Sequence, residues 1–168
     1  FGSLTAGRQY TPQFIALDSN DPFDTGAGSA VSSGIVSMFA SRANNSIMWG
    51  SPAFGPLTIT ALVAAGESTT GKQTNSSLAE VDFHLASGPA NLNLTLGGQQ
   101  KEVDTGVDAA ALTLGGSYDF GVVKLLGGVQ FVNNSTRKAD TEDNRREFFA
   151  GANVPVGADT LWIGAGAG

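Results

Sequence analysis

The strongest constraint on this chain is an alternation of apolar and polar residues with a period of two. In residues 78–86 the apolar positions are Ala79, Val81, Phe83 and Leu85, and the intervening polar positions are Glu80, Asp82 and His84. The same pattern recurs, more weakly in places, at 2–9, 45–52, 57–66, 91–97, 108–118, 122–132, 148–154 and 161–167. Successive side chains of a strand point to opposite faces, so the pattern predicts about nine β-strands and an all-β fold. Helical spacing of apolar residues is scarce.

The lengths of the links between these strands alternate. Short links at 53–56, 87–90, 119–121 and 155–160 are separated by long polar links at 67–77, 98–107 and 133–147. This predicts an up-and-down antiparallel sheet with tight turns at one end and long loops at the other, as in outer-membrane barrels. Soluble β-sandwiches usually cross between two sheets and lack this asymmetry.

Alternation alone fits a soluble barrel and a membrane barrel equally well. A soluble barrel has its apolar side chains inside and its polar ones outside, and a membrane barrel has the reverse. Several strands reach nine or more residues, and their polar faces carry more Thr, Asn, Gly and Gln than Lys and Glu, which favours the membrane. In that arrangement the polar wall residues Glu80, Asp82, His84 and Lys124 face the lumen. A soluble β-rich binding module is the alternative. No run approaches the roughly 18 apolar residues of a transmembrane helix.

The composition excludes several classes of chemistry. The 168 residues include no Cys and one His, which removes disulfides, thiolate metal sites and a two-histidine metal site. Nine basic residues stand against 15 acidic ones, a poor balance for binding nucleic acid. We therefore expect no cofactor, no metal and no nucleic-acid partner.

Two short motifs are typical of enzymes, but the residues around each of them differ from those that the enzyme site requires. Residues 66–72 match the first seven positions of a phosphate-binding loop, but Gln73 replaces the required Ser or Thr and no helix pattern follows. Asp-Thr-Gly occurs at 24–26 and again at 104–106, as in aspartic proteases, where two such carboxylates share a proton. Neither triplet is flanked by buried apolar strands. An aspartic protease is thus the enzyme alternative, and the preferred reading is not an enzyme.

Residues 10–42 form a long segment without sustained periodicity, bracketed by Arg8 and Arg42. Its first part carries the carboxylates Asp18, Asp21 and Asp24. Loops of this length inside β-proteins are uncommon and usually functional. The chain also begins and stops within strand-like sequence, without a signal peptide, so we expect a single partial barrel over 1–168 that belongs to a longer protein.

Residues 2–10, 16–23 and 42–54 resemble the general diffusion porins of Gram-negative outer membranes. The shared features are a strand ending in Gly-Arg, a long third loop, then an Arg before an Asn-Ser strand and a Ser-Pro turn. The resemblance is most specific over residues 1–66. In the rest of the chain it depends on the order of strands, short turns and long loops. It implies a 16-stranded barrel that forms a homotrimer in the outer membrane, among its lipid and lipopolysaccharide.

The same resemblance implies that segment 10–42 is a constriction loop folded into the lumen. Arg8 and Arg42 then fall at two wall positions of the constriction, and Asp18, Asp21 and Asp24 fall at or near the carboxylates of the loop. Arg8 shares strand parity with Leu4 and Ala6 on the lipid side, so we expect a bulge at Gly7 to turn it into the lumen. The alternative is that both arginines lie at the rim and bind lipid headgroups. The hypothesis is a channel for passive diffusion of ions and small hydrophilic solutes.

Overall fold

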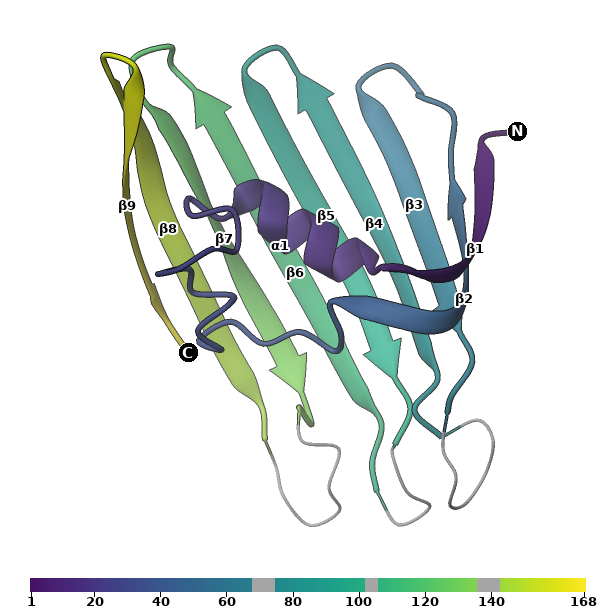
Figure 1. Ribbon diagram of the computed structural model, residues 1–168. Coiled ribbons are helices and arrows are strands. Elements are labelled where there is room, and N and C mark those ends of the chain that lie inside the picture. The colour runs from purple at the N-terminus through teal and green to yellow at the C-terminus, as the bar shows by residue number, and fades with distance from the viewer. Residues whose placement is uncertain (68–74, 102–105, 136–142) are drawn as a thin grey trace.

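The computed structural model describes residues 1–67, 75–101, 106–135 and 143–168 and contains one antiparallel sheet whose strands follow chain order (Figure 1). The strands are β1 (Ser3–Tyr10), β2 (Arg42–Gly50), β3 (Leu57–Ala64), β4 (Leu78–Ser87), β5 (Ala90–Gln99), β6 (Ala109–Asp119), β7 (Lys124–Asn133), β8 (Arg145–Val156) and β9 (Asp159–Ala167). The predicted all-β, up-and-down fold is confirmed. In the described residues β1 and β9 are edges, so the sheet does not close into a barrel.

Residues 10–42, which show no sustained periodicity in the sequence, include the helix α1 (Pro12–Asn20), which the sequence did not predict. Thr11 caps it by accepting a hydrogen bond from Phe14 N at 3.2 Å, and Pro12 occupies the first turn, where its missing N–H costs nothing. The helix is nine residues long. No helix among the described residues has the length and apolarity needed to cross a membrane.

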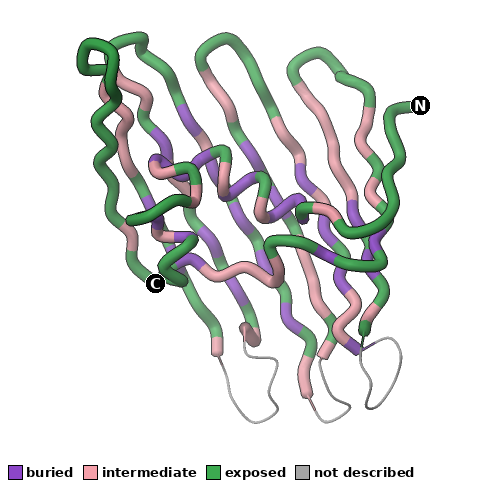
Figure 2. The backbone as a smooth tube through the Cα atoms, viewed as in Figure 1, coloured by how far each residue is buried: buried purple, intermediate pink, exposed green. Residues whose placement is uncertain are grey.

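Residues 11–41, here called the crossing segment, run across one face of the sheet (Figure 1). We call this the covered face and the opposite one the open face. Buried residues gather on the strands where the crossing segment passes (Figure 2). Leu17, Val31 and Val36 pack there against Phe149 of β8, and a second cluster joins Ala43, Leu62, Ala64 and Leu78.

The open face carries large apolar side chains in continuous rows. One row of paired residues from β3 to β8 is Ile59, Phe83, Leu94, Leu114, Val129 and Phe148. Several members are strongly exposed: Phe148 is 55% and Leu114 is 41% accessible. Burying one such side chain contributes about 1.5–3 kcal/mol, so a sheet with this surface requires an apolar environment.

Small residues on the covered face make room for the crossing segment. A Cβ at Gly115 would lie 2.9 Å from the Asn20 amide nitrogen, and a Cβ at Gly164 would lie 2.7 Å from the Phe23 ring. Both distances are too short for a real side chain. These glycines therefore allow the helix and the residues after it to approach the wall closely.

Candidate functional site

The two ends of the crossing segment meet at a neck beside β1 and β2. Thr11 N donates to Ser41 O at 3.1 Å, and Thr11 Oγ1 donates to Ala40 O at 2.8 Å. These bonds close the segment on itself. In Figure 1 the neck lies over the middle part of the sheet, where the end of β1 and the start of β2 cross in front of the other strands.

A register shift lies just before the neck, where the sequence predicted a bulge. Gly7 pairs with Ser46 and Gln9 pairs with Ala43, so the extra residue is on β2, opposite Arg8, and not on β1. Asn45 takes up the irregularity with a φ of 48°, a left-handed conformation that Asn tolerates better than most residues. The bulge is at the expected level of the sheet, but the partner strand supplies it.

Arg42 is exposed and held by Tyr10, its partner across the β1–β2 pair. Its guanidinium carbon lies 4.2 Å from the centre of the Tyr10 ring, and Nη2 donates to the Tyr10 hydroxyl. Tyr10 in turn stacks on Phe14 of α1, with ring centres 4.7 Å apart and planes at 15°. Arg8 is exposed. Gly7, with a φ of 116°, separates it from Leu4 and Ala6, and alternation beyond Gly7 puts Arg8 on the same side of β1 as Tyr10. Neither arginine forms an ion pair with a described residue.

Glu80 and Asp82 lie on the covered face, but the crossing segment buries them. Glu80 is 4% exposed, and its Oε2 accepts a hydrogen bond from Gln13 N, an N-terminal amide of α1, at 2.8 Å. A carboxylate is favourable at a helix N-terminus because unpaired N–H groups and the helix dipole point toward it. The second Glu80 oxygen has no hydrogen-bond partner among the described residues.

Asp82, 6% exposed, accepts from Thr95 Oγ1 at 2.7 Å and from Asn93 Nδ2 at 3.0 Å. Asn93 also accepts from Asn20 Nδ2, at 3.0 Å, which links this pair to the C-terminal end of α1. Glu80 and Asp82 thus lie on the polar face where the sequence predicts them, but the crossing segment covers them, which the sequence did not indicate. Glu80 bonds to the segment directly, whereas Asp82 bonds to wall residues of β5.

His84 and Lys124 are only half-buried, nearer the turn end of the covered face. The His84 Nε2 lies 3.3 Å from Asn91 Oδ1 on the neighbouring strand. Lys124 pairs with Asp119 in the β6–β7 register. It is an even number of residues before Gln130 on β7, so both lie on the covered face. Both therefore remain candidates for wall groups beside the segment.

Gln130 of β7 is the centre of the contact between wall and segment. It is 1% exposed, and its Oε1 accepts from Gln13 Nε2 at 3.0 Å and from Thr113 Oγ1 at 2.6 Å. Its Nε2 donates to Ser37 O at 2.6 Å and to Glu147 Oε2 at 2.9 Å. One amide thus joins both arms of the crossing segment to three neighbouring strands.

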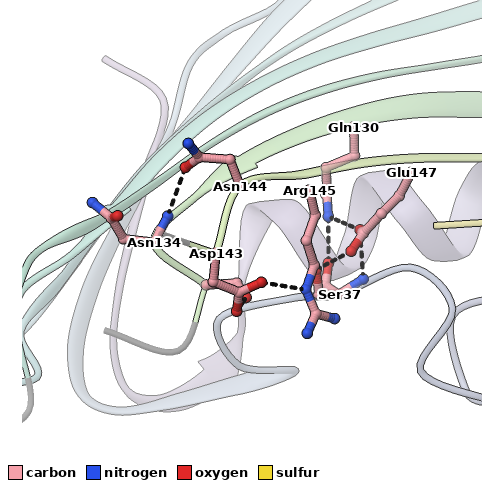
Figure 3. A network of polar contacts seen from close by, with 8 residues as sticks. Ser37, Gln130, Asn134, Asp143, Asn144, Arg145 and Glu147 are labelled. Carbon is pink, nitrogen blue, oxygen red and sulfur yellow. Dashed lines mark hydrogen bonds and ion pairs between the residues drawn. The ribbon is translucent and has the colours of Figure 1, made fainter. Parts of the chain in front are cut away.

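Glu147 of β8, 2% exposed, completes this anchor (Figure 3). Its carboxylate accepts from Ser37 N at 2.8 Å and from Ser37 Oγ at 2.6 Å. The two arms are also joined to each other, since Phe39 N donates to Gln13 Oε1 at 3.1 Å. Farther toward the loops, Arg145 and Asp143 form an ion pair at 3.1 Å (Figure 3).

The three segment carboxylates have different surroundings. Asp18 is half-buried and accepts from Thr25 Oγ1 at 2.8 Å, whereas Asp24 is exposed. Asp21 is fully buried, and it accepts from Phe23 N at 2.9 Å and from the Ser29 hydroxyl. Asp21 thus braces the turn after α1 and does not present its charge to open space, because the local amide and hydroxyl donors enclose it.

The enzyme motifs gain no support from the described residues. Most of the phosphate-loop match falls in 68–74, and the second Asp-Thr-Gly begins in 102–105, both outside the described residues. Asp24 of the first triplet has a left-handed φ of 47° at an exposed turn. An exposed turn does not supply the desolvated pair of carboxylates that acid proteolysis needs.

Sequence reasoning missed the anchors Gln13, Ser37, Gln130 and Glu147. Period two placed Gln130 on a polar wall, but nothing local distinguished it from the other polar residues there. Glu147 ends the long polar link 133–147 of the sequence, yet it is the second buried carboxylate, after Glu80, to accept a hydrogen bond from a backbone amide of the segment. Its parity with Phe149, which packs in the core, was the available signal.

Comparisons with known proteins agree over the whole chain. A family model described as Gram-negative porin matches residues 1–168. Outer membrane porin protein 32 of Delftia acidovorans is 30% identical over 173 residues, which cover 94% of this chain and 47% of that protein. The anion-selective porin from Comamonas acidovorans superposes with a TM-score of 0.82 at 26% identity, over 99% of this chain and 53% of that one. The chain spans about half the length of these relatives.

Proposed function

Since this chain belongs to the Gram-negative porin family and is located in the bacterial outer membrane, we propose that it forms a wall of a pore narrowed by the crossing segment. Ions and small hydrophilic solutes diffuse passively through the space beside that segment. The family indicates an outer-membrane channel and not an enzyme. The full-length protein would act as a homotrimer in contact with outer-membrane lipid and lipopolysaccharide.

The contrast between the two faces of the sheet is the observation that most strongly supports this proposal. The open face suits lipid: it carries rows of exposed apolar side chains, and the aromatic residues Tyr118 and Phe120 lie at its turn end. Aromatic residues also border the apolar band of membrane barrels. The covered face holds the segment, so closure of the sheet around that face would place residues 11–41 inside the lumen.

The charges of the segment and its neck would then face the pore. Arg8 and Arg42 are exposed cations on one side, and the half-buried Asp18 and the exposed Asp24 are carboxylates on the other. Opposed charges across a narrow aqueous gap create a transverse field, and the balance of sign sets ion preference. Asp21 contributes by holding the turn that positions Asp24. The pore acts by its field and width, with no bond chemistry and no cofactor.

The experiment replaces both cations in the full-length protein. Arg8→Ser combined with Arg42→Ser should shift the reversal potential in a KCl gradient toward cation preference, measured in planar bilayers. Arg146→Ser is the matched control, because Arg146 pairs with Phe131 on the open face and should leave the reversal potential unchanged. An unchanged potential in the double variant would remove these arginines from the constriction.

The two alternatives make different predictions. A soluble β-rich binding module would be recovered as a stable monomer without detergent, which the open face argues against. An aspartic protease would show acid proteolysis inhibited by pepstatin. Neither alternative is favoured by a feature of the described residues.

A further inference from the structure

Arg42, Tyr10 and Phe14 form a continuous array on the side of the crossing segment that faces away from the wall. The guanidinium lies 4.2 Å from the centre of the Tyr10 ring, and that ring lies 4.7 Å from the Phe14 ring. Ala43, next to Arg42, is buried against Leu62 of β3 and Leu78 of β4, so the start of β2 lies over the covered face (Figure 1). Arg42 and Tyr10 point away from that contact and therefore away from the wall.

The array leaves apolar side chains exposed, although other apolar side chains of the segment are buried. Tyr10 is 42% exposed, and Ile15, which follows Phe14 in the chain, is 45% exposed. In contrast, Leu17 and Val36 of the crossing segment are 1% exposed. The guanidinium has five N–H donors, and its hydrogen bond within the described residues is the one to the Tyr10 hydroxyl. An aromatic surface thus adjoins a cation with donors to spare.

We propose that this array is a subsite for planar aromatic carboxylates in transit, an inference that rests on the proposed pore. The solute carboxylate takes the free guanidinium donors of Arg42, a pairing that is often bidentate. Its ring lies beside the Tyr10–Phe14 stack, because Arg42 and Phe14 cover the two faces of Tyr10, and an edge-to-face contact with the stacked rings adds to the burial of the solute ring. The chemistry favours benzoate-like solutes over aliphatic carboxylates of the same charge.

Asp18 gives the subsite a direction. It lies one helical turn beyond Phe14, on the side opposite Arg42, and is half-buried, with its carboxylate held by Thr25. Its negative charge repels a carboxylate, so the acid group of the solute is directed to the Arg42 end. Arg8, two residues before Tyr10 on the same strand side, adds a second cation near that end.

The test measures block of the chloride current by organic anions in single full-length channels. Benzoate should reduce the current and raise its noise at concentrations where acetate does not, and cyclohexanecarboxylate should act about 5-fold more weakly than benzoate because it lacks the π-face. Phe14→Leu, which keeps apolar volume, should weaken the benzoate effect by about the same factor. Phe120→Leu is the control, since Phe120 is an exposed aromatic at a turn.

The outcomes separate the two proposals. If the channel conducts chloride but benzoate, cyclohexanecarboxylate and acetate act alike, the aromatic subsite is refuted and the pore stands. Equal benzoate block in wild type and Phe14→Leu also refutes the subsite. If the protein forms no chloride-conducting channel, the proposed function itself is refuted.

Discussion

Gln130→Leu tests whether the wall anchor holds the crossing segment at a fixed distance from the wall. The substitution keeps the residue buried and roughly preserves its volume, but it removes four hydrogen bonds. Two of them reach the segment, at Gln13 and Ser37, and two reach the wall, at Thr113 and Glu147. The strand itself should persist, because its backbone ladder to β6 and β8 is untouched.

The magnitude follows from these bonds. Neutral buried hydrogen bonds contribute about 1 kcal/mol each and one to a carboxylate about 2 kcal/mol, which gives a gross loss of about 5 kcal/mol. Leucine recovers about 1–2 kcal/mol through burial of its apolar side chain. A net loss of about 3 kcal/mol raises the population of the undocked segment about a hundredfold.

Single-channel recording detects that change as flicker between current levels within an open pore. We expect frequent transitions in Gln130→Leu and a smaller increase in Ser37→Ala, which loses one side-chain bond to Glu147. Thr95→Val is the control, because the Thr95 hydroxyl bonds to Asp82 inside the wall. Wild-type noise in Gln130→Leu, with an unchanged mean current, would show that the anchor does not position the segment.

Three further predictions test the packing and the membrane contact. Gly115→Ala forces a methyl group against the Asn20 amide at 2.9 Å, and we expect thermal unfolding in detergent to show a loss of about 1–3 kcal/mol; an unaltered melting temperature would contradict the close fit. Leu94→Arg, on the open face, should cost about 2–4 kcal/mol in folding titrations into bilayers, whereas a soluble sheet would tolerate it. Residues 1–168 alone should give no stable conductance in bilayers, because the edges of β1 and β9 stay unpaired in lipid; steady current from that piece would refute this.

The strands were predictable because each one repeats a strong local signal. Leu92, Leu94 and Leu96 alternate with polar residues over a length that a strand needs, and the structure places all three on one face. The alternation of short and long links then fixed the order of the strands, since hairpin neighbours pair. The local pattern and the topology of the sheet agree here, so a single sequence was sufficient to predict the strands and their order.

The helix was not predictable by the same route. Four of its five buried positions, Gln13, Ala16, Leu17 and Asn20, have helical spacing, but two of these four are polar. Hydrophobic periodicity cannot reveal a face that is buried through hydrogen bonds. The polar choice has a physical reason, because the wall beneath α1 is itself polar and offers Glu80 and Asn93 as partners.

The anchors were hidden for a related reason. Gln13 and Gln130 lie 117 positions apart in the chain, and Ser37 and Glu147 lie 110 apart. Which wall residues meet the segment depends on how far the helix reaches across the sheet, a distance that no local pattern encodes. The burial of Asp21 was hidden likewise, because it depends on the turn that returns Ser29 to the end of the helix.

The neck at Thr11 has a consequence for how such proteins are altered. Because Thr11 bonds directly to Ala40 and Ser41, everything between them is an insert whose ends are already joined. The residue pairs that join β1 to β2 all lie outside the insert. Evolution or a protein engineer can therefore exchange the insert as a cassette, provided that the new one keeps the contacts to Glu80, Gln130 and Glu147 on the wall.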